Sequence, residues 1–414
     1  MKKSELTNIV RIPSAILLIA LEFTNVVAFL AEGGNTPASI QHSRYPFQFA
    51  AYGLAVVVLL LDRQVLRRFF HKPIVYWSLC VLVLFTWSMV VRAFNAPVGY
   101  SNYEFVRYFG LRVNAIGFLL TCVVIFDDPR ILRLTRQAIA IATLAGVAFN
   151  IYDLLSPSVF SNIPGRAAGL YVQPNGAGMA LVFGGLLGVT AIRRLWMREV
   201  FLLCVLVGIL ATFSREAMLS SVFLLLGSVF AHKVSFRRLA IAGAACLALF
   251  AALNLSSDVT YSRLLNADTW ARMTLQWSDT STRDRLHLAE RTREQFEEAP
   301  LIGQGFGTAI FWADNQSHNA YLGLLADCGI LGSLVIPGLI FSIRRADWEF
   351  NTFASIFLLW AFFNHDVLVE FFALIAIAVE ANEYGAGYRR LKGRYRVKTA
   401  EPMMTPMSIR AIDA

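Results

Sequence analysis

The chain has 414 residues, of which 57% are hydrophobic and 16% are charged, and its mean hydropathy is +0.55. Soluble domains carry about 25% charged residues, so this composition excludes an ordinary soluble domain and favours a polytopic membrane protein. The net charge of +9 lies in short loops between apolar runs, which is typical of membrane topology rather than of nucleic-acid binding.

Apolar runs long enough to cross a bilayer recur along the chain. The basic N-terminus precedes a first run that is long for a signal peptide and has no evident cleavage site, so we predict an uncleaved span. About twelve spans are predicted, of which the seventh, eighth, eleventh and twelfth are short enough to be paired hairpins instead. The spans are 12–30, 46–61, 74–93, 106–126, 137–155, 174–192, 200–213, 217–232, 239–255, 318–342, 350–363 and 367–384. All five cysteines fall inside them, so no disulfide is expected.

Basic residues are distributed unequally between alternate loops. If the N-terminus is cytoplasmic, seven cytoplasmic segments hold 25 of the 37 Lys and Arg residues, including all six lysines. This is the positive-inside pattern, so both termini are predicted to be cytoplasmic. The other twelve basic residues are all arginine, either by chance in a lysine-poor chain or because the outer face binds phosphate or carboxylate. They are Arg44, Arg92, Arg107, Arg112, Arg166, Arg215, Arg263, Arg272, Arg283, Arg285, Arg291 and Arg293.

One outer segment, 256–317, is much longer than the other loops. Long loops in compact proteins are usually functional, so this loop is the predicted active region. The predicted fold is an all-α polytopic membrane protein with this large loop carrying short helices. Its predicted parts are a transmembrane bundle of nine spans (1–255), the loop (256–317), spans ten to twelve (318–385) and a basic cytoplasmic tail (386–414).

Within the loop, residues 283–298 have the pattern of an amphipathic helix with one misplaced charge. Ser281 and Asp284 resemble a capping box, and Pro300 with Gly303 ends the helix. Arg285 falls in the middle of the apolar face. A charge there is costly unless it is paired. Arg285 is therefore predicted to form a structural ion pair, to snorkel to the membrane surface, or to face an anionic substrate group in a pocket at that surface. The apolar face consists of Leu288, Ala289, Thr292 and Phe296.

Two features follow this helix. Gly303, Gly305 and Gly307 form a G-x-G-x-G run, but no strand precedes it, so we interpret it as a turn and not as a nucleotide-binding loop. His318 begins the tenth span at the membrane surface. A histidine there is either a capping or interfacial residue or a general base, because its pKa lies near neutrality.

Arginines also occur in two earlier outer turns. Arg215 lies between the seventh and eighth apolar runs, at or just inside the outer surface, where a charge is usually functional or paired; Glu216 is its nearest partner. Arg166 precedes a helix start at Pro174, and a solvated loop residue is the simpler interpretation.

Other polar residues leave alternatives open. His365 and Asp366, in the last outer turn, are a weaker candidate for a base or an ion site. Acids within predicted spans, namely Glu22, Asp153 and Glu370, keep a transporter possible. No spacing typical of metal ligands and no ATP-binding motif is evident.

Several of these segments together resemble the O-antigen ligase and polymerase family of bacterial membrane glycosyltransferases. They occur in the family's order over roughly the second half of the chain. Glu216 departs from the pattern, because the family more often has a small residue there. The segments are Arg166–Asn175 (RAAGLYVQPN), Phe213-Ser214-Arg215, Arg285 through Pro300-Leu301-Ile302-Gly303, and His318–Leu322 (HNAYL) through Gly329–Gly332 (GILG).

The resemblance implies an enzyme of the bacterial inner membrane with a periplasmic active site. It would transfer a glycan from undecaprenyl diphosphate to an acceptor sugar hydroxyl, with inversion and without a metal or other cofactor. Arg215, Arg285 and Arg166 would hold the diphosphate. His318 would deprotonate the acceptor. The supporting residues would be Asn319, Tyr321 and Arg283.

The acceptor would be a second lipid-linked glycan in a polymerase of surface polysaccharide, or lipid A–core in a ligase. The implied partners are the lipid-linked donor, this acceptor, the bilayer and, for a polymerase, a chain-length regulator, but no nucleic acid. Two alternatives from other classes remain, which are a flippase for lipid-linked glycans and a non-catalytic scaffold of an export complex.

Overall fold

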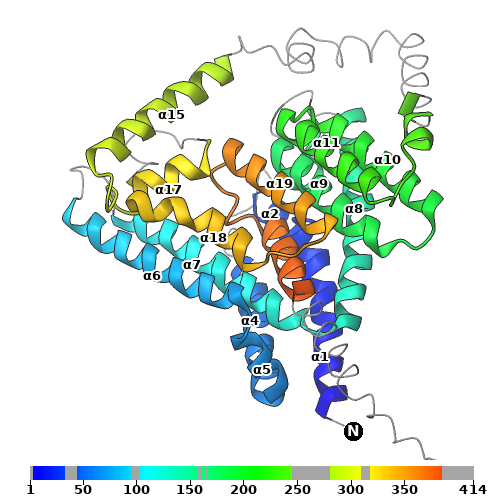
Figure 1. Ribbon diagram of the computed structural model, residues 1–414, viewed down its shortest axis with the longest axis horizontal. Helices are drawn as coiled ribbons and strands as arrows, with labels where there is room; N and C mark the ends of the chain where they lie inside the picture. The colour runs from blue at the N-terminus through cyan, green and yellow to red at the C-terminus, as the bar shows by residue number, and fades with distance from the viewer. Residues whose placement is uncertain are drawn as a thin grey trace, which may run out of the picture.

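In the computed structural model, the described residues are 3–32, 44–95, 102–156, 160, 161, 163, 166–241, 243, 244, 280–308 and 318–384. Every regular element in these ranges is a helix (Figure 1). The all-α class predicted from the sequence is therefore confirmed for the described part of the chain.

The described part of the first half contains seven α-helices and one π-helical turn. They are α1 (Lys3–Leu18), the π turn (Ile19–Phe23), α2 (Val26–Glu32), α4 (Arg44–Leu61), α5 (Arg63–Phe70), α6 (Pro73–Phe94), α7 (Asn102–Ile125) and α8 (Pro129–Leu155). The second half begins with a 3-10 turn (Gly169–Tyr171), α9 (Pro174–Ala191), α10 (Leu195–Thr212) and α11 (Arg215–Phe230). It continues with α15 (Thr280–Glu298), α17 (Ala320–Cys328), a 3-10 segment (Gly329–Leu334), α18 (Val335–Ser342), α19 (Trp348–Phe363) and a helix over 371–384.

Six of the described helical segments are long and apolar enough to cross a membrane, or seven if the bent pair Phe47–Leu61 and Arg63–Phe70 is one span. The chain thus has the character of a multi-pass membrane protein, but the prediction of twelve spans is not confirmed. The first predicted span is broken by the π turn and by Asn25, whose φ is 60°. The eighth and eleventh correspond to helices of only 16 residues, α11 and α19. Most of the ninth, and most of the loop 256–317, lie outside the described residues.

Helix α9 is the centre of the bundle. In its membrane-crossing window 78% of the residues are buried, against 39–56% in the other candidate spans. Its glycines permit this, because a Cβ on Gly184 would stand 2.1 Å from Thr143 Oγ1 of α8, and one on Gly188 would stand 2.7 Å from Phe201 of α10. Close backbone approach through small residues is a common way to pack membrane helices. Helices α8, α10 and α11 pack around α9, so the ends of these helices lie near one another.

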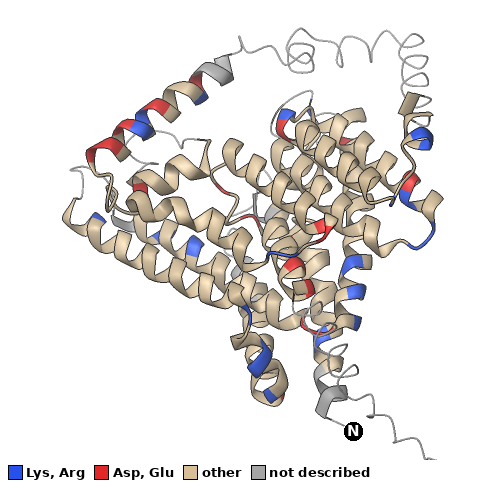
Figure 2. Cartoon of the chain, in the orientation of Figure 1, with Lys and Arg blue, Asp and Glu red and all other residues tan. Residues whose placement is uncertain are grey.

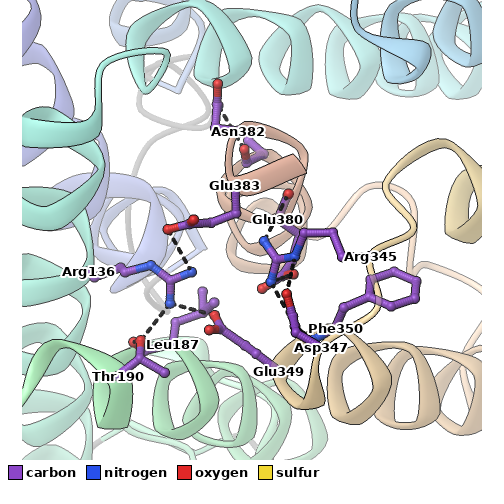
Figure 3. Close-up of polar contacts among 11 residues, drawn as sticks. Arg136, Leu187, Thr190, Arg345, Asp347, Glu349, Phe350, Glu380, Asn382 and Glu383 are labelled. Carbon is purple, nitrogen blue, oxygen red and sulfur yellow. Dashed lines mark hydrogen bonds and ion pairs between the residues drawn. The ribbon is translucent and has the colours of Figure 1, made fainter. Parts of the chain in front are cut away.

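Charged residues are sparse along the helices, whereas α15 carries residues of both signs and α5 is basic (Figure 2). A buried network joins α8, α9, α19 and the helix over 371–384 (Figure 3). Arg136 donates to Thr190 Oγ1 at 2.6 Å and pairs with Glu349 and, at 3.5 Å, with Glu383. Arg345 pairs with Asp347 at 2.8 Å and with the fully buried Glu380 at 2.9 Å. Each of these arginines thus has acidic partners from other segments, so that removing one partner would leave a poorly solvated charge uncompensated.

The same end of the bundle gathers other basic residues that the sequence places on the cytoplasmic side. Arg68 and Lys72 pair with Asp127 at 2.6 and 2.8 Å, and Lys72 also contacts Asn382. Arg11 donates to the carbonyl oxygens of Ile125 and Val124. This grouping agrees with the predicted orientation, in which one face of the bundle is basic. Which side of a membrane that face meets stays a prediction.

Candidate functional site

His318 lies immediately before α17, so its position is fixed by the start of that helix. Asn319 is the N-cap, and its Oδ1 accepts the backbone N–H groups of Tyr321 at 3.0 Å and Leu322 at 3.1 Å. Such a cap satisfies donors that the first helical turn leaves free. The membrane-crossing segment begins at Ala320, so the half-buried His318 stands just outside it.

A series of polar side chains extends to His318 from α7 and from the segment that follows α19. The ring of His365 lies 5.6 Å from that of His318. His365 Nε2 is 2.9 Å from Asp366 Oδ2, and Asp366 Oδ1 is 3.5 Å from Arg112 Nη2 of α7. Arg112 in turn donates to the hydroxyl of Tyr108. The pair His365–Asp366, which the sequence offered as an alternative to His318, is therefore its neighbour.

The surroundings of His318 favour the neutral imidazole. Burial and the positive charges of Arg285 and His365 lower the pKa of His318 to about 4, and Asp366 opposes them. At neutral pH His318 therefore keeps the lone pair that a proton acceptor needs. A base with so low a pKa is weak, however, until a negative charge comes close to it.

Glu216 is a buried acid on which the charges of arginines from three segments act. It is the second residue of α11 and only 5% exposed. Arg285 Nη1 of α15 lies 2.9 Å from Glu216 Oε1. Burial raises the pKa of Glu216, and the charges of Arg285, Arg166 and Arg215 oppose this increase. Of the three arginines named from the sequence as diphosphate-binding residues, Arg285 thus pairs with this carboxylate, and Arg166 and Arg215 add positive charge to its surroundings. The charge of Arg285 also acts on His318.

Helix α15 presents Arg285 from its buried face. Leu288 and Thr292 on that face are buried, whereas the Arg285 side chain keeps 27% of its exposure. Helix α15 packs against α17, along the edge of the bundle (Figure 1). The predicted position of Arg285 on the apolar face is confirmed. It forms an ion pair in this structure, as one of the interpretations of the sequence predicted.

The start of α11 is shaped by a tight turn. Phe213 has a left-handed backbone with φ 48°, and Ser214 Oγ accepts the N–H of Ala217 at 3.4 Å as the N-cap of α11. Arg215 follows as the first helical residue and is half-buried. The sequence suggested that Glu216 would pair with Arg215, but Glu216 pairs with Arg285.

Arg166 is held in place rather than solvated, so the simpler interpretation of this residue is wrong. Its Nε donates to the Thr212 carbonyl at 3.0 Å, and its Nη2 donates to Asn175 Oδ1 at 2.8 Å. The loop before α9 is organised by Asp153, which accepts four backbone N–H groups. These belong to Phe160, Ser161, Ala168 and Gly169, at 3.2, 3.4, 2.8 and 3.2 Å. Asp153 therefore has a structural role in this chain, which weakens one of the three arguments for a transporter.

The glycine run anchors the C-terminal end of α15. Gly303, Gly305 and Gly307 have φ values of +74°, +104° and +76°, so the prediction of a turn is confirmed. A Cβ on Gly305 would stand 2.5 Å from Cα of Arg92, which means that only glycine fits against α6. Asp327 of α17 accepts the N–H of Gly307 at 2.9 Å through Oδ2. The turn thereby clamps the loop helix to α6 and α17.

The remaining predicted residues have contacts of different kinds. Tyr321 donates its hydroxyl to the Leu358 carbonyl at 3.4 Å, and Asn319 is the cap of α17. The Arg283 side chain lies outside the described part of the structure. Within the described ranges, no group of three or more His, Cys, Asp or Glu residues is placed to hold a metal ion.

Sequence reasoning did not single out Arg92 and Arg112. Arg92 lies over the ring of Phe105 at 3.6 Å, and its Nη1 is buried without a hydrogen-bond partner. Arg112 lies 5.0 Å from the ring of Tyr108. Their only signal in the sequence was membership of the set of outer arginines. The contacts of these arginines with aromatic rings of α7 could not be predicted without knowing which helix packs against α7.

Comparison with known proteins gives one positive result. No curated protein sequence matches the chain. The family model for O-antigen ligase matches residues 200–337, from α10 into α18, a segment that contains Arg215, Arg285 and His318 but not Arg166. The resemblance noted in the sequence is thus confirmed: residues 200–337 match the O-antigen ligase family.

Proposed function

We propose that this protein is a membrane glycosyltransferase that moves a glycan from undecaprenyl diphosphate to an acceptor sugar hydroxyl at the periplasmic face of the bacterial inner membrane. The observation that carries the proposal is the ion pair of Arg285 with the buried Glu216 at 2.9 Å, where Arg166 and Arg215 add positive charge and the charge of Arg285 also acts on His318. An anion site beside a neutral imidazole suits a reaction with an anionic leaving group and a hydroxyl nucleophile.

In the proposed reaction the arginines act on the leaving group. Guanidinium groups bind phosphate oxygens through paired hydrogen bonds and stay charged. As the bond between the anomeric carbon and the phosphate oxygen breaks, the electron pair stays on undecaprenyl diphosphate. The arginines stabilise this additional charge, and no metal is required for that step.

His318 acts on the other reactant. It accepts the proton of the acceptor hydroxyl while the oxygen forms its bond to the anomeric carbon, opposite to the leaving diphosphate, so the configuration inverts. The donor's diphosphate brings negative charge near Arg285, which removes one cause of the low pKa of His318. The donor therefore strengthens the base that it needs, and we expect it to bind before catalysis becomes efficient.

The orientation in the membrane rests on the charge pattern. The buried network of basic residues at one end of the bundle corresponds to the predicted cytoplasmic segments. The site residues come from the predicted outer segments. Both termini are therefore proposed to be cytoplasmic, and the twelve-span topology remains open.

The test uses the purified full-length chain in liposomes with a lipid-linked glycan donor. His318→Ala is expected to lower turnover by at least about 100-fold, because general base catalysis contributes on that scale. His287→Ala is the matched control, since His287 is exposed on α15. Normal turnover by His318→Ala at a normal protein level would exclude the proposed base.

The same assay separates the acceptors and the alternatives. A second lipid-linked glycan as acceptor identifies a polymerase, whereas lipid A–core identifies a ligase. Movement of the donor across the bilayer without any transfer would instead indicate a flippase. A scaffold predicts no turnover and no effect of Arg215→Ala or Arg285→Ala on glycan synthesis in cells.

A further inference from the structure

The carboxylate that pairs with Arg285 occupies a place that the proposed function assigns to the donor. Glu216 is 5% exposed, and its Oε1 lies 2.9 Å from Arg285 Nη1. Arg166 and Arg215 add positive charge from the loop before α9 and from the first residue of α11.

Glu216 is also favoured by its place in the helix. It lies in the first turn of α11, where the positive end of the helix dipole attracts an anion. The Glu216 carboxylate and the phosphate of a ligand would both be attracted to this helix end and to the Arg285 guanidinium. Because like charges repel at short distance in a poorly solvated site, both anions cannot contact Arg285 equally well.

We propose that Glu216 is an internal competitor of the substrate: it occupies the diphosphate subsite in the free protein, yields Arg285 to the donor, and recaptures Arg285 when the product leaves. The inference rests on the proposed function. It assigns to Glu216 a role in substrate binding and release that neither the family match nor the local packing of α11 supplies.

The charges of donor and product explain why such a competitor is useful. In the donor, each phosphorus of the diphosphate carries one ionised oxygen, since both are esterified. After the anomeric C–O bond breaks, the released undecaprenyl diphosphate has a terminal phosphate with a second ionisable oxygen. Three arginines without an opposing anion would therefore hold the product more tightly than the donor. Glu216 weakens this preference and allows turnover.

The test compares variants that remove the charge in different ways. Glu216→Gln keeps an acceptor oxygen for Arg285 but removes the anion, and Glu216→Ala removes both. Binding of undecaprenyl diphosphate to the purified full chain is measured in detergent micelles, with undecaprenol as the uncharged control lipid. Both variants are expected to bind the diphosphate about tenfold more tightly than the original protein. In turnover assays Glu216→Gln is expected to show a lower KM for the donor, a lower kcat and stronger inhibition by undecaprenyl diphosphate.

The opposite result has a clear meaning. If Glu216 only anchors Arg285, both variants bind the diphosphate more weakly, and Glu216→Ala more so than Glu216→Gln. That result, or unchanged affinity, overturns the proposal. If Glu216→Gln does not accumulate, Glu216→Ala decides alone. Failure of the proposed function is distinguishable, because the original protein would then show no preference for the diphosphate over undecaprenol.

Discussion

Replacing Arg285 by alanine should lower stability and activity by separable amounts. The substitution leaves the carboxylate of Glu216, which is 5% exposed, without the ion pair at 2.9 Å. It also removes one of the three guanidinium groups proposed to hold the diphosphate. A second substitution, Glu216→Gln, removes the stranded charge but does not restore the guanidinium.

The magnitude follows from burial. Removing one partner of a fully buried ion pair costs about 3–5 kcal/mol. Water reaches this pair from the Arg285 side, where the side chain keeps 27% of its exposure, so a loss of about 2 kcal/mol is expected. For activity, loss of one donor to a developing anion typically costs about 100- to 1,000-fold in kcat. The double variant should recover most of the stability and little of the activity.

Thermal unfolding in detergent measures the first effect, and turnover of a lipid-linked donor measures the second. For a chain of 414 residues, a loss of about 2 kcal/mol corresponds to a fall of about 2 °C in Tm. Arg291→Ala is the control, because Arg291 is exposed on the same helix. If the double variant were as unstable as Arg285→Ala, the ion pair would not be the reason for the instability. If Arg285→Ala retained full turnover, Arg285 would have no part in leaving-group stabilisation.

Three further predictions concern the base, the glycine clamp and the Arg166 loop. Because the pKa of His318 in the free protein is about 4, kcat/KM should fall with acid only near pH 4. The value of kcat should fall at a higher pH, because the charge of the bound donor raises the pKa of His318. A fall of kcat/KM with acid near pH 6.5 would contradict the buried setting of His318. By linkage, the unfolded chain binds more protons at His318 than the native protein between about pH 6.5 and 4, so stability should fall with acid across this range, and less so in His318→Ala. In Gly305→Ala the new Cβ would stand 2.5 Å from the backbone of Arg92, at a residue with φ +104°, so the free energy of unfolding should fall by at least about 2 kcal/mol. The control is Gly323→Ala on α17, which should be neutral or slightly stabilising because nothing lies within 4 Å of its Cβ. Equal Tm values for the two variants would refute the clamp. Asp153→Asn replaces one carboxylate oxygen, such as the Oδ2 that accepts two backbone N–H groups, by an amide NH2 group that cannot accept them. It should therefore loosen the loop that carries Arg166 and weaken binding of the glycan donor. A transporter instead predicts lost flux with unchanged binding of the glycan donor.

Sequence patterns predicted the features that depend on one helix at a time. Arg285 could be placed on the buried face of α15 because helical periodicity alone determines which residues share a face. His318 could be placed at a helix start because Asn319 is a strong N-cap and an apolar run follows it. The glycine turn was predictable for the same local reason, since no strand precedes Gly303.

Counting the spans failed because hydropathy does not detect interruptions. The first apolar run looks continuous, yet a π turn and the left-handed Asn25 divide it. Helix α11 is too short and too polar at its start to count as a span by composition, although it packs against α9 in the core. Packing between helices, rather than the length of an apolar run, decides whether such a segment is stable.

The pairing at the centre of the site depends on a general rule that the sequence interpretation overlooked. Arg215 and Glu216 are adjacent in sequence, and adjacent residues on a helix point in different directions. A buried carboxylate at the second position of α11 therefore needs a partner from another element. That partner, Arg285, lies 69 positions away on a helix whose docking is set by the glycine clamp and by α17. The same holds for His318 and His365, which meet only because α17 packs against α19. In a helical membrane protein the residue types of a charged site can be recognised from the sequence. Which guanidinium meets which carboxylate is decided by helix packing, and the stability of Arg285→Ala with and without Glu216→Gln measures that decision directly.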